Sequence, residues 1–460
     1  MLKLNKRLSL LAAVVFIATA CSEPDQEIFD AFTPEQLANS NNPVLTDVLK
    51  ASAYQRIIGT WGGHNSLWSM HEVASDEMVI AHKGADWEDG GQWIRTHRHE
   101  YLPNEQAVNN GWVYCYSAIG DINLLILQFP DVVALTAELR ALRALVYLWI
   151  IDAYGNAPII TEESLDATPP TNSRQEIFNF IESSILDNID NLSTDNTKTT
   201  VNKWVAHAIL AKLYLNAEVY TGSARYTDAK THIDAIINSG QFSLTNNYFA
   251  NFATQNEGSP ENIFTIPYDE NNAGGFNLVQ MTLHYSSQET FDLQEQPWNG
   301  YASLEEFYNS YEDGDSRKNS FLEGPQFASD GSRLLDTSFE PDDPDGAPLT
   351  FTPEINMLTP NSLRQAGVRV GKFQFALGAG SNLSNDFPIF RYGDILLMKA
   401  ELEWKLGNNG VALDFINQVR QRAGVDPLTS IDADILLAER GREVFAEGYR
   451  RSDLIRLGAY

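Results

Sequence analysis

The sequence predicts a mainly α-helical fold in which helical hairpins form a scaffold around a long, loop-rich region. Two observations predict it. Apolar residues recur at helical spacing in long stretches within about 115–240 and 388–458. Between them, about 243–387 is rich in Gly, Asn, Asp and Pro and has no sustained periodicity. Because so long a loop region is uncommon in a compact domain and usually has a function, we expect it to carry a ligand site.

The first helical stretch, "LTAELRALRALVYLWIIDAYGNAPII", is apolar on nearly every face from Leu135 to Ile151. This pattern predicts a helix that is buried on most sides. Gly155 and Pro158 follow, and both residue types end helices. We therefore expect the helix to stop just before Gly155.

The second stretch, 201–240, predicts two helices around a loop at Gly222, with Gly240 as the final cap. Their facing sides are predicted to be lined by Ala208, Ala211 and Leu215 on one helix and by Ala229, Ile233 and Ile236 on the other.

The third stretch, "GDILLMKAELEWKLGNNGVALDFINQVRQRAG", predicts a hairpin with a tight turn at Gly407. Ala400 and Ala412 are small enough to let the two helices approach closely. The second helix is predicted to pack through Ala412, Phe415, Ile416, Val419 and Ala423. A helix, a glycine turn and a helix with this offset form a tetratricopeptide-like hairpin, and several such hairpins stack into a scaffold.

Composition and charge limit the kinds of partner. Apolar residues make up 43% of the chain and charged residues 20%, as in folded globular proteins. Asp and Glu number 61 against 32 Lys and Arg, so the formal net charge is −29. Such a surface repels nucleic acid and anionic membrane surfaces. We expect no nucleic-acid partner and favour neutral or cationic ligands.

The N-terminus has the features of an export signal. A basic segment that ends at Arg7 is followed by an uncharged apolar run from Leu8 to Ala20. This run is shorter than the roughly 20 residues of a membrane-spanning helix, so residues 1–20 are predicted to be a signal peptide. The small residues before Cys21 resemble a bacterial lipobox, so we expect Cys21 to be lipidated and 21–42 to form a tether. The alternative is an ordinary secretory signal with Cys21 incidental.

The sequence lacks the common catalytic and cofactor motifs. It contains no GxxxxGK[ST], GxSxG, GxGxxG, CxxC or HExxH pattern, and its 8 His residues are scattered. Asp313 and Asp315 resemble part of a calcium loop, but the twelve-residue ligand pattern is incomplete. We expect no catalytic residue and no cofactor, with a structural calcium ion as the alternative.

Four separated blocks share the pattern of one family. They read "VASDEMVIAHKGADWEDGGQWIRTHRHEY", "LRALRALVYLWIIDAYGNAPI", "DFPIFRYGDILLMKAELEWKLG" with "ALDFINQVRQRAG", and "ERGREVFAEGYRRSDLIRLG". In this order they resemble the SusD/RagB outer-membrane lipoproteins of Bacteroidetes over most of residues 21–460. The resemblance implies a SusD-like domain over 43–460. The family usually continues beyond the position of Tyr460, so we expect this chain to be a fragment or to lack that segment.

The resemblance also implies a function. It implies a surface-exposed lipoprotein of the outer membrane that captures an oligosaccharide without catalysis and delivers it to a SusC-like TonB-dependent transporter. One alternative is a tetratricopeptide-like scaffold that binds a protein or peptide. Another is a glycoside hydrolase that uses Asp86 or Asp89 as a carboxylate.

Glycan sites combine exposed aromatic rings, which stack on sugar faces, with polar groups that bond the hydroxyls. Loops with this mixture are "TWGGHNSLW", "GADWEDGGQW" and "QPWNGY". The candidate glycan contacts are Trp61, His64, Asn65, Asp86, Trp87, Asp89, Trp298 and Arg369. The carboxylates favour a neutral glycan, for which a glucan or fructan is a reasonable first trial.

For several of these residues the sequence leaves a structural role open. Trp61, Trp87 and Trp298 could stack on sugar or fill the core, whereas Trp68 and Trp93 lie beside apolar residues and are predicted to be core. Arg369 could bond sugar hydroxyls or bridge structural carboxylates. The set Glu443, Glu447, Arg450 and Arg451 predicts a structural ion-pair network, with Glu447 and Arg451 paired at i, i+4 on one helix.

Overall fold

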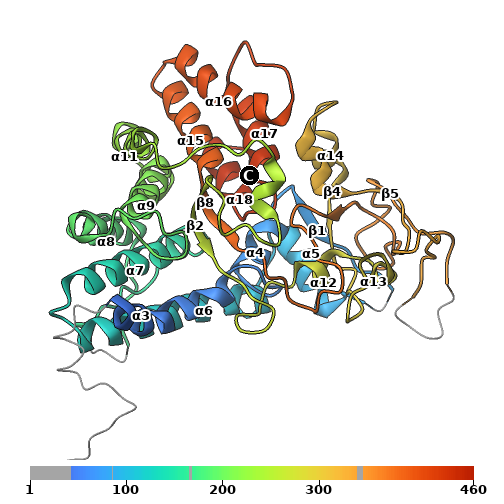
Figure 1. The fold of residues 1–460 in the computed structure, drawn as a ribbon, viewed down its shortest axis with the longest axis horizontal. Coiled ribbons are helices and arrows are strands. Elements are labelled where there is room, and N and C mark those ends of the chain that lie inside the picture. Colours follow the sequence, from blue (N-terminus) through green and yellow to red (C-terminus); the bar gives the residue numbers. More distant parts are fainter. Residues whose placement is uncertain (1–42, 85, 165–167, 339–344) are drawn as a thin grey trace, which may run out of the picture. The chain divides into compact units, whose positions relative to one another are not determined.

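The computed structural model describes residues 43–84, 86–164, 168–338 and 345–460, and Thr46–Tyr460 forms one compact unit. Helices dominate and the strands are short, which confirms the predicted mainly α fold (Figure 1). The predicted signal peptide and tether, including Cys21, lie outside the described residues. Among the described helices, none is both long and apolar enough to cross a bilayer.

Ten helices of the described chain build the scaffold. They are α6 (Gln106–Gln128), α7 (Val133–Ala153), α8 (Arg174–Leu186), α9 (Lys203–Leu215), α10 (Ala217–Thr221), α11 (Tyr226–Ser239), α15 (Tyr392–Lys405), α16 (Asn409–Ala423), α17 (Ala433–Val444) and α18 (Arg450–Leu457). α6, α7, α8 and α9 pack each against the next, α9 packs against α11, α11 against α15, and α15 against α16 (Figure 1). The two predicted hairpin regions are therefore joined through α11 and α15, and the loop-rich region leaves the scaffold between these two helices.

The predicted helix faces are buried. α7 is buried on most sides from Leu135 to Ile151 and ends before Gly155, as predicted. The six predicted contact residues of α9 and α11 are at most 1% exposed. Gly407 adopts a φ of +83° in the turn between α15 and α16, a conformation that favours glycine. Across this turn Ala412 and Ile416 are buried against Leu397 and Ala400.

The remaining elements are short, except for the 15-residue helix α3. They are α3 (Pro43–Ile57), η1 (Ile58–Thr60), α4 (Leu67–Val73), β1 (Met78–Ile80), η2 (Asp89–Gly91), α5 (Gln92–His97), η3 (Ile189–Asn191), η4 (Tyr248–Phe252), β2 (Asn262–Ile266), α12 (Leu278–Thr282), α13 (Ser287–Phe291), β3 (Tyr301–Ser303), α14 (Glu305–Asn309), η5 (Ser316–Ser320), β4 (Phe321–Leu322), β5 (Gly324–Pro325), β6 (Thr350–Phe351), β7 (Arg369–Val370) and β8 (Phe387–Arg391). The strands pair antiparallel in twos, as β1–β3, β2–β8, β4–β7 and β5–β6. Because β1 pairs with β3, the chain before residue 90 lies beside the chain around residue 300.

A buried ion-pair network joins the scaffold to the loop-rich region. At its centre is Arg391, whose guanidinium lies 2.8 Å from a carboxylate oxygen of Glu261, 2.6 Å from Glu443 and 2.7 Å from Glu447. All four side chains are at most 1% exposed. Arg422 and Arg317 also pair with Glu443. The prediction of a structural ion-pair role is therefore confirmed for Glu443 and Glu447, and Arg450 forms an ion pair with Asp76.

The predicted pairing of Glu447 with Arg451 on one helix is wrong. α17 ends at Val444 and α18 begins at Arg450, and the intervening turn contains Ala446 at a φ of +60°. Glu447 instead pairs with Lys372 and Arg391, whereas Arg451 donates to the backbone oxygen of Asp152. The i, i+4 spacing predicted one continuous helix, but tertiary contacts impose a turn between Val444 and Arg450.

Of the two aspartates of the calcium alternative, Asp315 is paired with Arg317. Its carboxylate receives hydrogen bonds from the Arg317 backbone N–H and from the Arg317 guanidinium at 2.8–3.0 Å, and both side chains are fully buried. Asp315 is therefore the N-cap of η5 and the buried ion-pair partner of Arg317.

Glu72 and Glu77 form a buried carboxyl pair beneath the α17–α18 turn. Glu72 accepts a hydrogen bond from the Gly448 N–H at 2.6 Å, and Glu77 accepts one from the Ala446 N–H at 3.1 Å. Burial raises the pKa of Glu72 to about 7 and raises the pKa of Glu77 well above its usual value. The pair therefore favours the protonated form, and two charges cannot easily coexist there.

We expect Glu72→Gln to stabilise the protein at pH 8 by about 1–2 kcal/mol and to have little effect at pH 5. A folded-state pKa above the unfolded value means that the stabilising contribution is present at low pH and is lost as the pH rises through 7. The neutral amide avoids this loss. Urea unfolding at the two pH values measures the difference, with exposed Glu354→Gln as the control. An equal effect of Glu72→Gln at both pH values would contradict the assignment.

Candidate functional site

A cleft of about 450 Å³ lies where the chain before residue 90 meets the chain near residue 300. Its lining residues are His64, Asp86, Trp87, Asp89, Tyr285, Gln296, Pro297 and Trp298. Antiparallel pairing of β1 with β3 places Ile80 opposite Tyr301, which brings these separate segments together. The structure thus gathers five of the eight predicted contact residues at one place: His64, Asp86, Trp87, Asp89 and Trp298.

Two indole rings form the aromatic part of the cleft. Trp298 is half-buried, and the His64 ring meets it at 4.9 Å between centroids with an interplanar angle of 66°. Trp87 is only 8% exposed, and its Nε1–H donates to the Trp298 backbone oxygen at 2.5 Å. The Trp87 ring also packs against Tyr301 at 6.0 Å. Trp298 therefore offers the accessible ring, and Trp87 supports it from behind.

The Trp298 loop is fixed by backbone hydrogen bonds and by a buried lysine. Trp298 N–H donates to the Gln280 oxygen at 2.7 Å, and Gly300 N–H donates to the Met281 oxygen at 2.9 Å. From below, Lys83 Nζ donates to the backbone oxygens of Asn299 and Gly300 at 2.8 and 2.9 Å. Burial lowers the pKa of Lys83 well below its usual value. The backbone of the Trp298 loop is therefore held in place before any ligand arrives.

Two carboxylates stand beside the rings in fixed orientations. Asp86 accepts from the Tyr285 hydroxyl at 2.5 Å and from the Trp87 N–H at 3.0 Å, and its partial burial raises its pKa. Asp89 is exposed and accepts from Trp93 Nε1 at 2.7 Å. Each carboxylate oxygen has two lone pairs, so both groups can accept further hydrogen bonds from hydroxyls.

His64 is held by Asn277. The His64 backbone N–H donates to Asn277 Oδ1 at 3.1 Å, and Asn277 Nδ2 lies 3.4 Å from the ring nitrogen Nδ1 of His64. Burial lowers the pKa of His64, so the ring is neutral at pH 7. When Nδ1 accepts from the Asn277 amide, Nε2 carries the ring proton and can donate it to a ligand.

Left-handed backbone conformations occur at two residues that line the cleft, Trp87 and Asp89, and at Asn65 and Asn299, each of which directly follows a lining residue in the sequence. The non-glycine residues Asn65, Trp87, Asp89 and Asn299 have φ values of 56°, 61°, 41° and 56°. Such a conformation is unusual for a bulky residue such as Trp87 and costs about 1–3 kcal/mol. Strain of this kind concentrates at ligand-binding segments because the surrounding contacts hold it in place.

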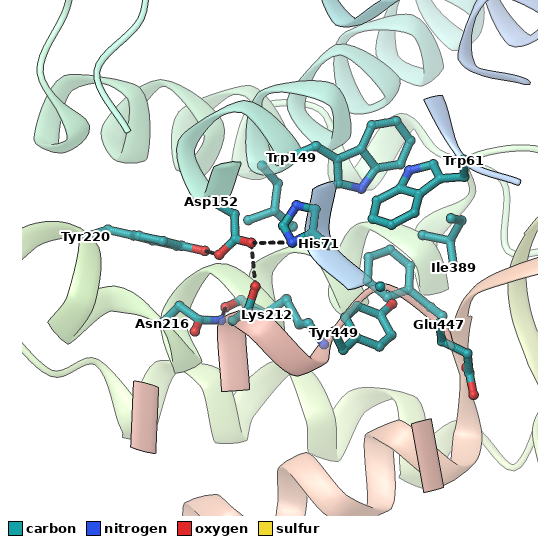
Figure 2. A pocket seen from close by; sticks show the side chains of 14 residues that line it. Trp61, His71, Trp149, Asp152, Lys212, Asn216, Tyr220, Ile389, Glu447 and Tyr449 are labelled. Atoms are coloured by element: carbon teal, nitrogen blue, oxygen red, sulfur yellow. Dashed lines mark hydrogen bonds and ion pairs between the residues drawn. The ribbon is translucent and has the colours of Figure 1, made fainter. Parts of the chain in front are cut away.

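The candidate glycan contact Trp61 is instead a core residue. It is 4% exposed, stacks on His71 at 5.9 Å between centroids and meets Trp149 at 5.6 Å. Figure 2 shows these rings around an internal cavity, with Asp152 between His71 and Tyr220. This cavity has a volume of only about 40 Å³, room for a few water molecules and not for a sugar. Gly448, which lacks a side chain, lies directly against the Trp61 ring.

Arg369 and Asn65 also lie away from the cleft lining. The Arg369 side chain is fully buried, donates to the backbone oxygens of Ala366 and Arg364 at 2.9 and 2.7 Å, and donates to Asn299 Oδ1 at 2.8 Å. Arg369 therefore has the structural role that the sequence left open. The guanidinium donates these hydrogen bonds to backbone and amide oxygens and not to the carboxylates that were considered. Asn65 is 9% exposed and its backbone oxygen accepts from Asn110. Trp68 and Trp93 are 1% exposed, as predicted for core residues.

The sequence reasoning missed Tyr285, Gln296 and Pro297. Gln296 and Pro297 directly precede Trp298 in the quoted loop, so their inclusion could have been expected. Tyr285 lies between α12 and α13 without any local feature that marks it. A second cavity of similar size, about 460 Å³, lies between α7, α10 and α18, but no tryptophan lines it. The cleft at Trp298 therefore combines an accessible indole, fixed carboxylates and clustered strain.

Comparison with known proteins gives one consistent result. The sequence model of the SusD family matches residues 366–460. A SusD-like protein (P38) of Formosa agariphila is 26% identical, over 94% of this chain and 86% of its own length. The starch-binding protein SusD of Bacteroides thetaiotaomicron is 24% identical, over 87% and 78%. The structure of surface glycan-binding protein A from Bacteroides thetaiotaomicron in complex with laminarihexaose superposes with a TM-score of 0.70 at 22% identity, covering 90% of both chains. The predicted SusD-like fold is confirmed.

Proposed function

The chain belongs to the SusD/RagB family, and from this premise we propose that it is a non-catalytic lipoprotein that captures a neutral oligosaccharide in the Trp298 cleft. We further propose that it delivers the oligosaccharide to a SusC-like TonB-dependent transporter. The observation that carries the proposal is the cleft itself. One accessible indole and two carboxylates line it together, and hydrogen bonds fix the orientations of both carboxylates.

The chemistry of the cleft suits a sugar. The apolar face of a pyranose ring can stack on Trp298, because aromatic rings bury large apolar area at well-defined geometry. Its hydroxyls can donate to Asp86 and Asp89 and can accept from His64 Nε2. Two carboxylates beside the ring would repel a carboxylate or sulfate group on the ligand. We therefore propose an uncharged glycan.

The relatives suggest which uncharged glycans to try first. One is named for starch binding, and one structure holds laminarihexaose, so both named ligands are glucans. An α-linked and a β-linked gluco-oligosaccharide are the natural first probes. The acceptor-rich cleft is compatible with either.

The location is proposed from the sequence and the family. Small residues before Cys21 favour lipidation, and acidic residues follow at once in "CSEPDQE". The family's lipoproteins sit on the outer membrane. We propose that this chain is anchored there through Cys21 and exposed at the cell surface, beside its transporter.

Calorimetric titration of the lipid-free chain, residues 22–460, with laminarihexaose and maltohexaose tests the proposal. The same mixtures are analysed for shorter products after a day. Binding without cleavage supports a non-catalytic receptor. Product formation would replace it with a glycoside hydrolase that uses Asp86 or Asp89. Absence of binding to these and to other neutral glycans, together with capture of a peptide partner, would replace it with the scaffold alternative.

Gly300→Ala should weaken glycan binding by about 3–10-fold although Gly300 itself offers no side chain to the ligand. A Cβ at Gly300 would overlap the Trp87 ring, with Cε2 only 2.6 Å away, so the ring that supports Trp298 must move. Titration with the bound hexasaccharide measures the change. Gly410→Ala on α16 is the matched control, since a Cβ there meets nothing within 4 Å. Unchanged affinity in Gly300→Ala would mean that Trp87 does not position Trp298.

A further inference from the structure

The cleft limits how much of a glycan the protein can contact. Its volume is about 450 Å³. A pyranose unit in a chain has eleven heavy atoms and takes up roughly the volume of five water molecules, about 150 Å³. The cleft therefore has room for two or three consecutive sugar rings.

The exposed aromatic surface of the cleft also limits the number of sugar rings that can be bound. Of the aromatic residues that line the cleft, Tyr285 is 2% exposed and Trp87 is 8% exposed, so neither presents a full face. Trp298 and His64 are half-buried, but the His64 ring already packs against Trp298 at an interplanar angle of 66°. Among the described lining residues, Trp298 thus supplies one stacking platform, enough for one ring face.

The polar groups lie close to that platform. The indole N–H of Trp87 donates a hydrogen bond to the Trp298 backbone oxygen. Asp86 directly precedes Trp87, and the exposed Asp89 follows it by two residues. Asp86 is held by Tyr285, and Gln296 is two residues from Trp298 in the same loop. These groups can bond the stacked sugar and its immediate neighbours. More distant sugars would meet no polar group of the cleft.

We infer that the cleft recognises a short internal or terminal stretch of unsubstituted glycan, two to three rings long, with one ring stacked on Trp298. This inference deepens the proposed function and depends on it. Sugars beyond the third ring project from the cleft and add no contact with its described lining residues. Affinity is therefore set by the trisaccharide, and longer chains gain only from the number of registers in which they can bind.

The test is a calorimetric series with glucose and with laminari-oligosaccharides of two, three, four and six rings, repeated with the malto-series. For the series that binds, we expect affinity to rise at least tenfold from the monosaccharide to the trisaccharide. From the trisaccharide to the hexasaccharide it should rise by no more than about fourfold, because a hexasaccharide offers four trisaccharide registers. A tenfold or larger rise from three to six rings would overturn the inference.

Two controls separate this inference from the proposed function. If no oligosaccharide of any length binds, the proposed function fails; if long ones bind much more tightly than short ones, only the short-site inference fails. Trp298→Ala should lower the affinities of the trisaccharide and the hexasaccharide by the same factor, because both use the same platform. A hexasaccharide that retains its affinity in this variant while the trisaccharide loses it would show a second contact region and overturn the inference.

Discussion

We expect Arg391→Met to destabilise the folded protein by about 3–5 kcal/mol, because it removes one member of a buried ion-pair network. Arg391 is 1% exposed and binds Glu261, Glu443 and Glu447, each within 2.8 Å. Without the guanidinium these carboxylates lose a shared partner but stay buried, and an uncompensated charge in the interior is costly. Urea unfolding followed by tryptophan fluorescence measures the loss.

The matched control is Arg56→Met, because the pair of Arg56 with Asp121 is largely exposed. Exposed pairs contribute about 0–1 kcal/mol. If Arg391→Met is too unstable to purify, Lys372→Met is the second variant, since Lys372 is buried and donates to Glu447 at 2.5 Å. Arg391 and Lys372 variants that lose no more stability than the Arg56 variant would show that the remaining arginines compensate for the missing charge.

The helical scaffold could be predicted from sequence because its information is local. The spacing of Ala208, Ala211 and Leu215, or the glycine at 407, follows from helix geometry alone. The structure adds what no local pattern contains, namely that α11 packs against α15 across an insertion of about 150 residues. For the same reason the Glu447–Arg451 pair was predicted wrongly. The turn between α17 and α18 is held by Glu72 and Glu77, which lie far away in the sequence.

The cleft could be predicted only in part. Residue type identified the three loops, since aromatic, acidic and glycine residues occur together there, and β1–β3 pairing then brought two of these loops and His64 of the third together. Sequence could not separate Trp61 from Trp298. Both lie within two residues of a glycine, but the Trp61 ring packs against Gly448, a residue nearly 390 positions away in the sequence. Arg369 was ambiguous because its partners, such as Asn299, are distant in the sequence.

Trp298→Ala should weaken binding of the preferred gluco-oligosaccharide by about 1–3 kcal/mol, or roughly 5- to 150-fold. The reason is that Trp298 supplies the accessible stacking face of the cleft, and truncation to alanine removes the apolar area that a pyranose ring would cover. The backbone should stay in place, because the hydrogen bonds of residue 298 to Gln280 and Trp87 involve main-chain atoms. Calorimetric titration of wild type and variant with laminarihexaose and maltohexaose measures the change.

Trp204→Ala is the matched control. Trp204 lies on α9, is half-buried like Trp298, and donates through Nε1 to the Thr194 backbone oxygen, but it does not line the cleft. Its loss should leave the affinity unchanged. Trp298→Phe should keep part of the affinity, because a smaller aromatic face remains. Wild-type affinity in Trp298→Ala would show that no sugar ring stacks on Trp298 and that the glycan binds elsewhere on the protein. A loss in Trp298→Ala that Trp298→Phe partly restores can come only from the aromatic face, and this result would locate the sugar ring on Trp298.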